Sequence, residues 1–434
     1  MFIDFLLSLP VLVKVLGTLA AILLINLFSR NLMAAIGGGA LILGFWSGHS
    51  VSAIGRIAWS RFSSTDNLLL MVVLCQIMWL SSLMAHTEVM QDLVRAVRER
   101  VPHRLAFAAL PAVIGLLPMP GGAMFSAPMV DRADSEGRLP PLLKTQTNYW
   151  FRHLWEYWWP LYPGVILTLD LTGLEIWQFM LVQFPVTLMA MAGGYLFLLR
   201  RIPRSEGADP RPNAPPGPSF LVLIAPIFTV IATYGALMIA VPPVRELSRY
   251  IPIGVGLFLA LAVLQLQRRA SWSIWRRVLL SRTTLYMAVL VAIIRIYGAM
   301  IEARLPGGML LVEQMRSELN LIGLPEAFFF ILIPFITGLA VGINVGTVGA
   351  AFPVVLTLLG PSPELSVLVP TTVLAYAAGF MGQMLSPVHV CLAVTNQYFK
   401  TSLLRSLGGL LPPTALVMVG VFGFSRLLSF LWPV

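Results

Sequence analysis

The sequence predicts an all-α polytopic membrane protein, built from two inverted-topology repeats with about ten transmembrane helices and two re-entrant hairpins. The first observation is composition: 58% of the 434 residues are hydrophobic and 11% are charged, with a mean hydropathy of +0.84. Soluble domains carry about 25% charged residues. The second is that apolar runs of about 20 residues, the length that crosses a bilayer, recur along the chain. The third is that two further apolar runs are broken by proline and glycine.

Ten uninterrupted apolar runs are the predicted spans. They cover residues 9–28, 32–50, 66–85, 154–171, 176–199, 219–241, 250–267, 283–301, 366–396 and 404–430. The first is expected to be a span rather than a cleaved signal peptide, because Asp4 precedes it without a basic n-region and a second apolar run follows from Leu32. Cys75 and Cys391 lie in apolar runs and are expected to be free thiols.

The two interrupted apolar runs, 105–130 and 325–359, predict the re-entrant hairpins. The first breaks at 118–122 (PMPGG), which no continuous helix would tolerate. The second contains four glycines between 338 and 349, with Asn344 and Thr347 among them. Small residues at this spacing also mediate close helix packing, but the amide and the hydroxyl in the same turn favour a hairpin. Broken backbone at membrane depth is tolerated where it is buried in protein or lines a cavity.

The order of elements indicates an internal repeat. Each half contains three spans, an amphipathic interfacial helix (87–100 and 309–319), a hairpin and two more spans. The proline-rich segment 201–218 links the halves, so the predicted repeats are 1–200 and 219–434. Matching residues support the repeat: Pro111 and Gly115 with Pro334 and Gly338, 223 apart, and Pro160 and Thr168 with Pro387 and Thr395, 227 apart. Five spans per half require the second half to be inverted.

The basic residues predict the orientation. Loops around residues 30, 95–104, 132–144, 200–211, 268–282 and 400–405 hold nineteen Lys and Arg residues, against six in the opposite loops. The richer side should be cytoplasmic, which puts both termini outside. It also places the mouth of the first hairpin inside and that of the second outside. The net charge of +10 therefore reports membrane orientation, and we expect the bilayer, not nucleic acid, as partner.

Three motifs resemble a known family. LLPMPGGAMFSAPMVD, TNYWFRHLWEYWWPLYPG and GFMGQMLSPVHVCLAVTNQYF are similar to a prokaryotic integral-membrane family catalogued as a domain of unknown function within the ion transporter superfamily. Gluconate permeases, dicarboxylate carriers and large TRAP-type subunits are more distant members. The resemblance implies a homodimer in the prokaryotic cytoplasmic membrane, a scaffold domain, a mobile transport domain and elevator-like alternating access. Relatives carry a Ser-Asn-Thr signature at the hairpin tips; here Asn344 and Thr347 fit it in part, and the first hairpin departs from it.

The candidate site residues cluster at the breaks. Those predicted to bind solute are Gly121, Gly122, Ser126, Asn344, Gly346, Thr347 and Ser386. Those predicted to break helices are Pro118, Pro120, Pro160 and Pro387. Those predicted to couple transport to an ion are Arg152, His153, Glu156 and His389, because ionisable side chains inside a membrane are functional candidates. No metal-ligand spacing is present, and no cofactor is expected beyond Na⁺ or H⁺ as a coupling ion.

Three assignments stay open. Arg152 and Glu156 can pair at helical spacing, either buried or at the cytoplasmic interface within an aromatic belt. His389 is either a site residue or a satisfied core histidine. Arg295 lies deep in a span and could pair with Glu302 or Asp66, or face a dimer interface, while Asp170 is expected at the outer end of its span.

The leading hypothesis is a secondary active transporter for a small, anionic organic solute such as a carboxylate. Paired inverted repeats with interrupted segments are the best sequence indication of a transporter binding site, and half-helix N-termini suit an anion. A cation/proton antiporter is the first alternative, although neither hairpin tip contains an acid. A non-transporting scaffold subunit is the second. The absence of HExxH, GxGD and Ser/Lys dyad motifs argues against a membrane enzyme.

Overall fold

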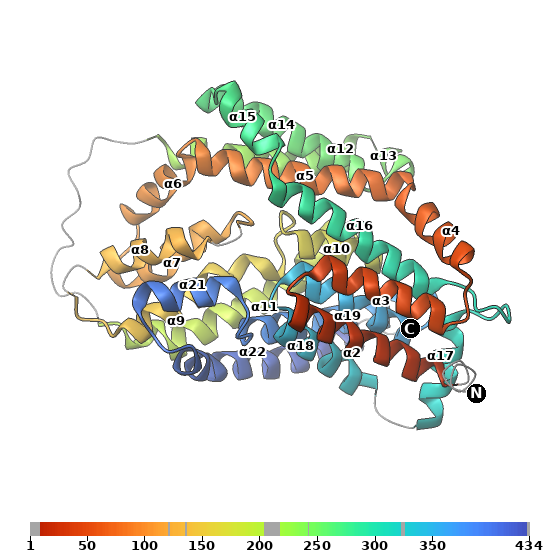
Figure 1. The fold of residues 1–434 in the computed structure, drawn as a ribbon. Helices are drawn as coiled ribbons and strands as arrows, with labels where there is room; N and C mark the ends of the chain where they lie inside the picture. The colour runs from red at the N-terminus through yellow and green to blue at the C-terminus, as the bar shows by residue number, and fades with distance from the viewer. Residues whose placement is uncertain are drawn as a thin grey trace.

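The computed structural model describes residues 9–119, 122–134, 137–203, 218–241, 243–322 and 326–431. This part of the chain is an assembly of helices packed side by side (Figure 1). Eight helices in it are long and apolar enough to cross a membrane. They are α2 (Val11–Ser29), α5 (Thr65–His86), α11 (Ile176–Phe197), α12 (Phe220–Ala240), α14 (Tyr250–Arg268), α16 (Arg282–Glu302), α20 (Leu365–Met384) and α22 (Leu403–Leu431). The all-helical polytopic membrane fold is confirmed.

Three of the ten predicted spans differ from this description. The run 32–50 forms the shorter helix α3 (Leu32–Trp46). The run 154–171 is not one helix: α9 (Pro141–Arg152) leads into a 3₁₀ turn, η1 (Leu154–Tyr157), and α10 (Pro163–Thr172) follows. The run 366–396 is likewise divided into α20 and α21 (Val390–Phe399). In the two divided runs the break contains Pro160 or Pro387, which lacks the N–H that a continuous helix needs. The run 32–50 contains no proline, and Gly48, just after α3, has a left-handed φ of 85°.

Helix pairs stand where the two hairpins are predicted. The first consists of α7 (His103–Gly115) and α8 (Ala123–Ala133), and the second of α18 (Glu326–Val341) and α19 (Asn344–Leu359). In the second pair the turn is made by Gly342, whose φ of 68° is left-handed and favours glycine. In the first pair, residues 120 and 121 lie outside the described residues.

Helices that begin in polar loops are capped by nearby side chains. Asn31 accepts a hydrogen bond from the backbone N–H of Ala34 at the start of α3, and Ser64 caps α5 in the same way. The N-terminus of α2 has no such cap, and there the carboxylate of Glu318 accepts bonds from the first two backbone N–H groups, at 2.9 and 2.8 Å. Glu318 belongs to α17 (Leu311–Ile322), one of the two predicted interfacial helices; the other is α6 (Val89–Arg98).

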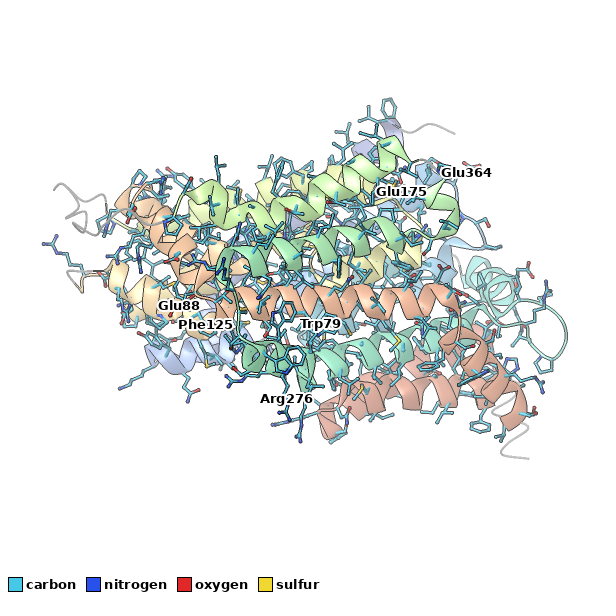
Figure 2. The ribbon with its side chains drawn as sticks, turned by 90° about the horizontal axis from the view of Figure 1, so that it is seen from above. Trp79, Glu88, Phe125, Glu175, Arg276 and Glu364 are labelled. Carbon is cyan, nitrogen blue, oxygen red and sulfur yellow. The ribbon has the colours of Figure 1, made fainter. Side chains whose placement is uncertain are left out.

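Two groups of helices can be distinguished by their contacts. In the first group α2 packs on α3, α3 on α16, α16 on α5, α5 on α14 and α14 on α12. Figure 2 shows α5, α14 and α12 lying next to each other over the rest of the molecule. The second group contains both helix pairs, the two divided helices, α11 and α22 (Figure 1). Two short helices, α4 (Val51–Phe62) and α15 (Trp272–Leu279), lie outside the predicted elements and pack on α16 and α5.

A buried ion pair connects the two groups. Asp170 of α10 lies with its Oδ1 3.1 Å from Nη1 of Arg295 in α16, and both side chains are less than a tenth exposed. The hydroxyl of Tyr250 donates to the same carboxylate. Arg295 therefore pairs with neither Glu302 nor Asp66, the partners considered from the sequence. Glu302 instead pairs with Arg61 at the surface.

Candidate functional site

A cavity of about 170 Å³ lies where the two helix pairs meet the two divided helices. Pro118 and Met119 line it from the first pair, and residues 342–345 from the second. Arg152 and Glu156 line it from the first divided helix, and Gln383, His389 and Cys391 from the second. A larger apolar groove of about 400 Å³ lies between α11, α12 and α14, but its described lining contains no Asp, Glu, Lys, Arg or His. The smaller cavity is the candidate site, because the ionisable candidates from the sequence, Arg152, Glu156 and His389, gather there.

Arg152 connects the cavity to the first helix pair. Its guanidinium is buried, and Nη2 donates to the backbone oxygen of Met119 at 2.8 Å. Nη1 lies 3.2 Å from Nε2 of His153 and 4.0 Å from Oε1 of Glu156. Gly122 packs against the same guanidinium, and a Cβ at that position would lie 2.9 Å from Nε. The close approach explains why glycine stands at this tip.

Glu156 connects the cavity to the second helix pair. Its carboxylate accepts a bond from Nε2 of Gln383 at 3.3 Å. Its backbone oxygen accepts from the hydroxyl of Tyr376 at 2.7 Å, and that hydroxyl accepts from Nδ2 of Asn344 at 2.8 Å. Asn344 also packs on Gly164, where a Cβ would lie 2.7 Å from the amide carbon. Both helix-pair tips are thus bonded to one short segment, 152–156.

The histidines form a compact cluster at the cavity wall, where His389 lines the cavity and His153 lies behind it. Nδ1 of His153 lies 2.6 Å from the backbone oxygen of Tyr149, so this nitrogen carries the proton and Nε2 accepts from Arg152. The rings of His153 and His389 meet edge to face at 4.9 Å. One ligand atom each from His153, His389 and Cys391 lie within 4.8 Å of one another. The residue types suit a metal, but the guanidinium on His153 opposes a cation there.

Close backbone packing positions the divided helices. Gly115 of α7 lies so near the backbone oxygen of Arg152 that a Cβ would overlap it, and Gly338 of α18 meets the backbone oxygen of Gly379 in the same way. The hydroxyl of Tyr162 donates to the backbone oxygen of Gly115. Substituting either glycine would therefore displace a helix that carries cavity residues.

Some of the site residues predicted from the sequence line the cavity. Arg152, Glu156, Asn344, His389 and Pro118 line the cavity, and His153 lies directly behind it. Arg152 and Glu156 are buried, 2% and 7% exposed, rather than at an interface.

The other predicted site residues that the structure describes are not part of the cavity lining. Ser126, Gly346, Thr347 and Ser386 are buried. The hydroxyl of Ser386 donates to Leu339 and that of Thr347 to Ile343, so both hold backbone. Pro160 lines the apolar groove and Pro387 lies exposed in a turn. Pro120 and Gly121 lie outside the described residues.

Two polar residues of the site were not predicted as candidates. Tyr376 bridges Asn344 to Glu156, and Gln383 bonds the Glu156 carboxylate. A signal for them exists in the sequence. Tyr376 stands 227 residues after Tyr149 and Gln383 stands 227 after Glu156, the same offset as between Pro160 and Pro387.

Comparisons with known proteins bear on both family and fold. The fold is similar to that in the crystal structure of the Alcanivorax borkumensis YdaH transporter, with a TM-score of 0.60 over 88% of this chain and 90% of that chain. Sequence identity is 13%, so this likeness concerns the fold alone. No curated protein matches the sequence. The family described as "Protein of unknown function (DUF401)" matches residues 8–424. Because this match covers nearly the whole chain, the protein belongs to the DUF401 family.

Proposed function

We propose that the protein is a secondary active transporter, not an enzyme, that moves a small, anionic organic solute by elevator-type alternating access coupled to protons or sodium. The observation that carries the proposal is the cavity itself, where two helix-pair tips and two divided helices converge on a buried arginine. Interrupted helices that meet at one cavity are the arrangement that transporters use to bind solutes. The fold of a protein described as a transporter supports the same conclusion.

Inverted repeats, 1–200 and 219–434, account for equivalent contacts in the two halves. α7 packs on α9 as α18 packs on α20, and α8 packs on α21 as α19 packs on α10. Gly115 contacts the backbone of Arg152, and Gly338 contacts the backbone of Gly379. Gly379 stands 227 residues after Arg152. Glu156 and Gln383, also 227 apart, bond to each other. This pattern supports a pseudo-two-fold axis through the cavity and two re-entrant hairpins of opposite orientation.

The two groups of helices supply the parts of an elevator. The group that contains α5, α14 and α16 would be the scaffold, and it would carry the homodimer interface. The group that contains the hairpins would carry the solute across the membrane. Both termini would lie outside, in the cytoplasmic membrane of a prokaryote, and the segment 201–218 would link the repeats inside. The Asp170–Arg295 pair joins the two groups and would have to part during the movement.

Within the site, Arg152 would bind the anionic group and Asn344 would hydrogen-bond the solute. Gly122 and Gly346 would let the tips approach closely, while Ser126, Thr347 and Ser386 would shape them. Gly121 would contribute a backbone donor at the first tip. Glu156, His153 and His389 are the candidates for carrying a coupling proton, since intramembrane proton relays use these residue types.

Uptake by the purified protein in proteoliposomes tests the proposal. A panel of carboxylates and sugar acids would be offered with imposed proton or sodium gradients, and accumulation of at least one solute is expected. No flux of any solute under any gradient would refute transport and leave the scaffold-subunit alternative. Cation/proton antiport is a second candidate, favoured by the buried Glu156 carboxylate beside a helix break. It predicts that cations alone dissipate a pH gradient, without any organic solute.

A further inference from the structure

We propose that transport is electroneutral, with one proton carried on Glu156 for each monoanion held by Arg152. This inference rests on the proposed function and specifies its solute charge, coupling ion and stoichiometry. It follows from the charges in the cavity, from the groups that contact the Glu156 carboxylate, and from the apolar lining.

The cavity holds one pair of opposite charges. Among the described lining residues, Arg152 is the one Lys or Arg and Glu156 is the one Asp or Glu. Their closest nitrogen and oxygen are 4.0 Å apart, so the charges compensate each other without a tight hydrogen bond. An anion that binds Arg152 neutralises the guanidinium in place of Glu156. The Glu156 carboxylate is then an unpaired charge in a buried site. An unpaired buried charge is costly, so one positive charge must enter with each monoanion.

The surroundings of Glu156 favour a proton over a metal cation. Its two carboxylate oxygens face nitrogen atoms: Nη1 of Arg152, Nε2 of His153 and Nε2 of Gln383. Sodium and other hard cations need a shell of oxygen ligands. Among the described residues, the contacts of this carboxylate are to nitrogen atoms and none is to an oxygen atom. The other titratable groups around it, none of which is a permanently charged cation, are the side chains of Tyr149, Tyr157, Tyr162, Tyr376, His389 and Cys391.

A protonated Glu156 finds an acceptor in Gln383. Oε1 of Gln383 is buried without a hydrogen-bond partner, while its Nε2 donates to Glu156 at 3.3 Å. Rotating the amide by half a turn exchanges the two atoms and presents Oε1 to a carboxylic O–H. The same two side chains can therefore bond in both protonation states of Glu156. When the proton leaves, the amide returns to donating and Arg152 regains its partner.

The lining limits the solute to one negative charge. The described lining contains no Lys or Arg besides Arg152, and it includes Met78, Met119 and Met287, whose side chains are apolar thioethers. A second carboxylate would face these apolar groups without a cation. A volume of about 170 Å³ suits a compact body, since a cavity of about 150 Å³ holds a benzene ring. The structure thus favours a small monoanion with an apolar body over dicarboxylates and sugar acids.

The test compares 3-methyl-2-oxobutanoate with 2-oxoglutarate, two five-carbon 2-oxo acids that differ in the second carboxylate. Proteoliposomes containing the full chain receive either a pH gradient, acid outside, with the membrane potential clamped to zero, or a potential of about 100 mV, negative inside, without a pH gradient. A pH difference of one unit should support about tenfold accumulation of the monoanion, since one proton is carried per anion. The potential alone should support none, and 2-oxoglutarate should not accumulate.

Substitutions at Glu156 and Arg152 separate proton coupling from anion binding. Glu156→Gln should abolish accumulation driven by the pH gradient while retaining exchange of labelled for unlabelled monoanion, whereas Arg152→Gln should lose both. Glu364→Gln, at the exposed start of α20, is the matched control and should behave as the unchanged protein. Accumulation driven by the potential, a preference for the dianion, proton-driven uptake in Glu156→Gln, or uptake of neither probe would overturn the inference. In the first three cases transport is itself observed, so the transport proposal stands. If neither probe is taken up, it stands when another solute of the wider panel is carried, and both fail when none is.

Discussion

The buried pair Asp170–Arg295 makes the sharpest prediction about stability. Asp170→Leu removes the carboxylate and leaves the Arg295 guanidinium, 9% exposed, without its partner. Breaking a buried ion pair costs about 3–5 kcal/mol. The two atoms are 3.1 Å apart, yet Nη1 of Arg295 lacks hydrogen-bond geometry. We therefore expect the lower end of that range, about 3 kcal/mol in the free energy of unfolding.

Removing the arginine instead of the aspartate should reduce the free energy of unfolding by less. Arg295→Met leaves Asp170 with the hydroxyl of Tyr250, which still donates to its carboxylate. A buried carboxylate that keeps one hydrogen bond is less destabilising than a buried charge without a partner. We therefore expect a loss of about 1–2 kcal/mol in the free energy of unfolding. The double variant replaces the pair by two apolar side chains, which is often neutral. Its stability should lie within about 1 kcal/mol of the unchanged protein, giving a coupling energy of at least about 3 kcal/mol.

Equilibrium unfolding in detergent micelles, followed by tryptophan fluorescence, measures all three variants. The surface pair Arg61–Glu302 supplies the control, because its side chains are 31% and 62% exposed. Exposed pairs contribute about 0–1 kcal/mol, so Glu302→Leu should change little. The reasoning is refuted if Asp170→Leu costs no more than Glu302→Leu, or if the double variant loses the sum of the two single losses.

Three further predictions concern single residues. Gly338→Ala should destabilise by at least about 1–3 kcal/mol through overlap with neighbouring backbone, while Gly298→Ala, which meets open space, should not; equal unfolding midpoints would contradict this. Tyr376→Phe should cost about 1–3 kcal/mol, because a buried amide loses its partner, and an unchanged urea midpoint would argue against the bridge. Burial lowers the pKa of Lys144, but hydrogen bonds to two aspartates outweigh it and raise the pKa above the ordinary 10.5. The stability that Lys144 contributes should therefore be constant below pH 10.5 and lost above it, as a comparison with Lys144→Met across pH would show.

Much of the fold follows from local chemistry. Long apolar runs predict spans because a bilayer requires about 20 apolar residues, and the eight long helices lie within or near such runs. The breaks at 118–122 and 338–349 are predictable because proline and clustered glycine disfavour a continuous helix. α7 ends at Gly115, before the first break, and α8 begins after it at Ala123, while the left-handed Gly342 lies in the second break.

The site was less predictable because burial depends on distant segments. Segment 141–153 reads as a polar loop ahead of a span, yet Thr145 to Arg152 is buried throughout, because α9 packs on α7, α8 and α21. The partner of Arg295 is 125 residues away, and nothing local distinguishes Asp170 from Glu302, which is 7 residues away, or from Asp66, which is 229 residues away. Polar side chains that appear interfacial from hydropathy are, in the folded chain, the wall of a cavity.

The segment 152–156 explains how one event in the cavity could affect both hairpins. Its first side chain holds the first tip through the backbone oxygen of Met119, and its last backbone oxygen holds the second tip through Tyr376 and Asn344. An anion at Arg152 competes with Met119 for the guanidinium but leaves the bond from Tyr376 in place. Solute binding would then loosen one tip while the other stays tied. Such asymmetry is what alternating access requires, since two gates that loosened together would leave an open pore.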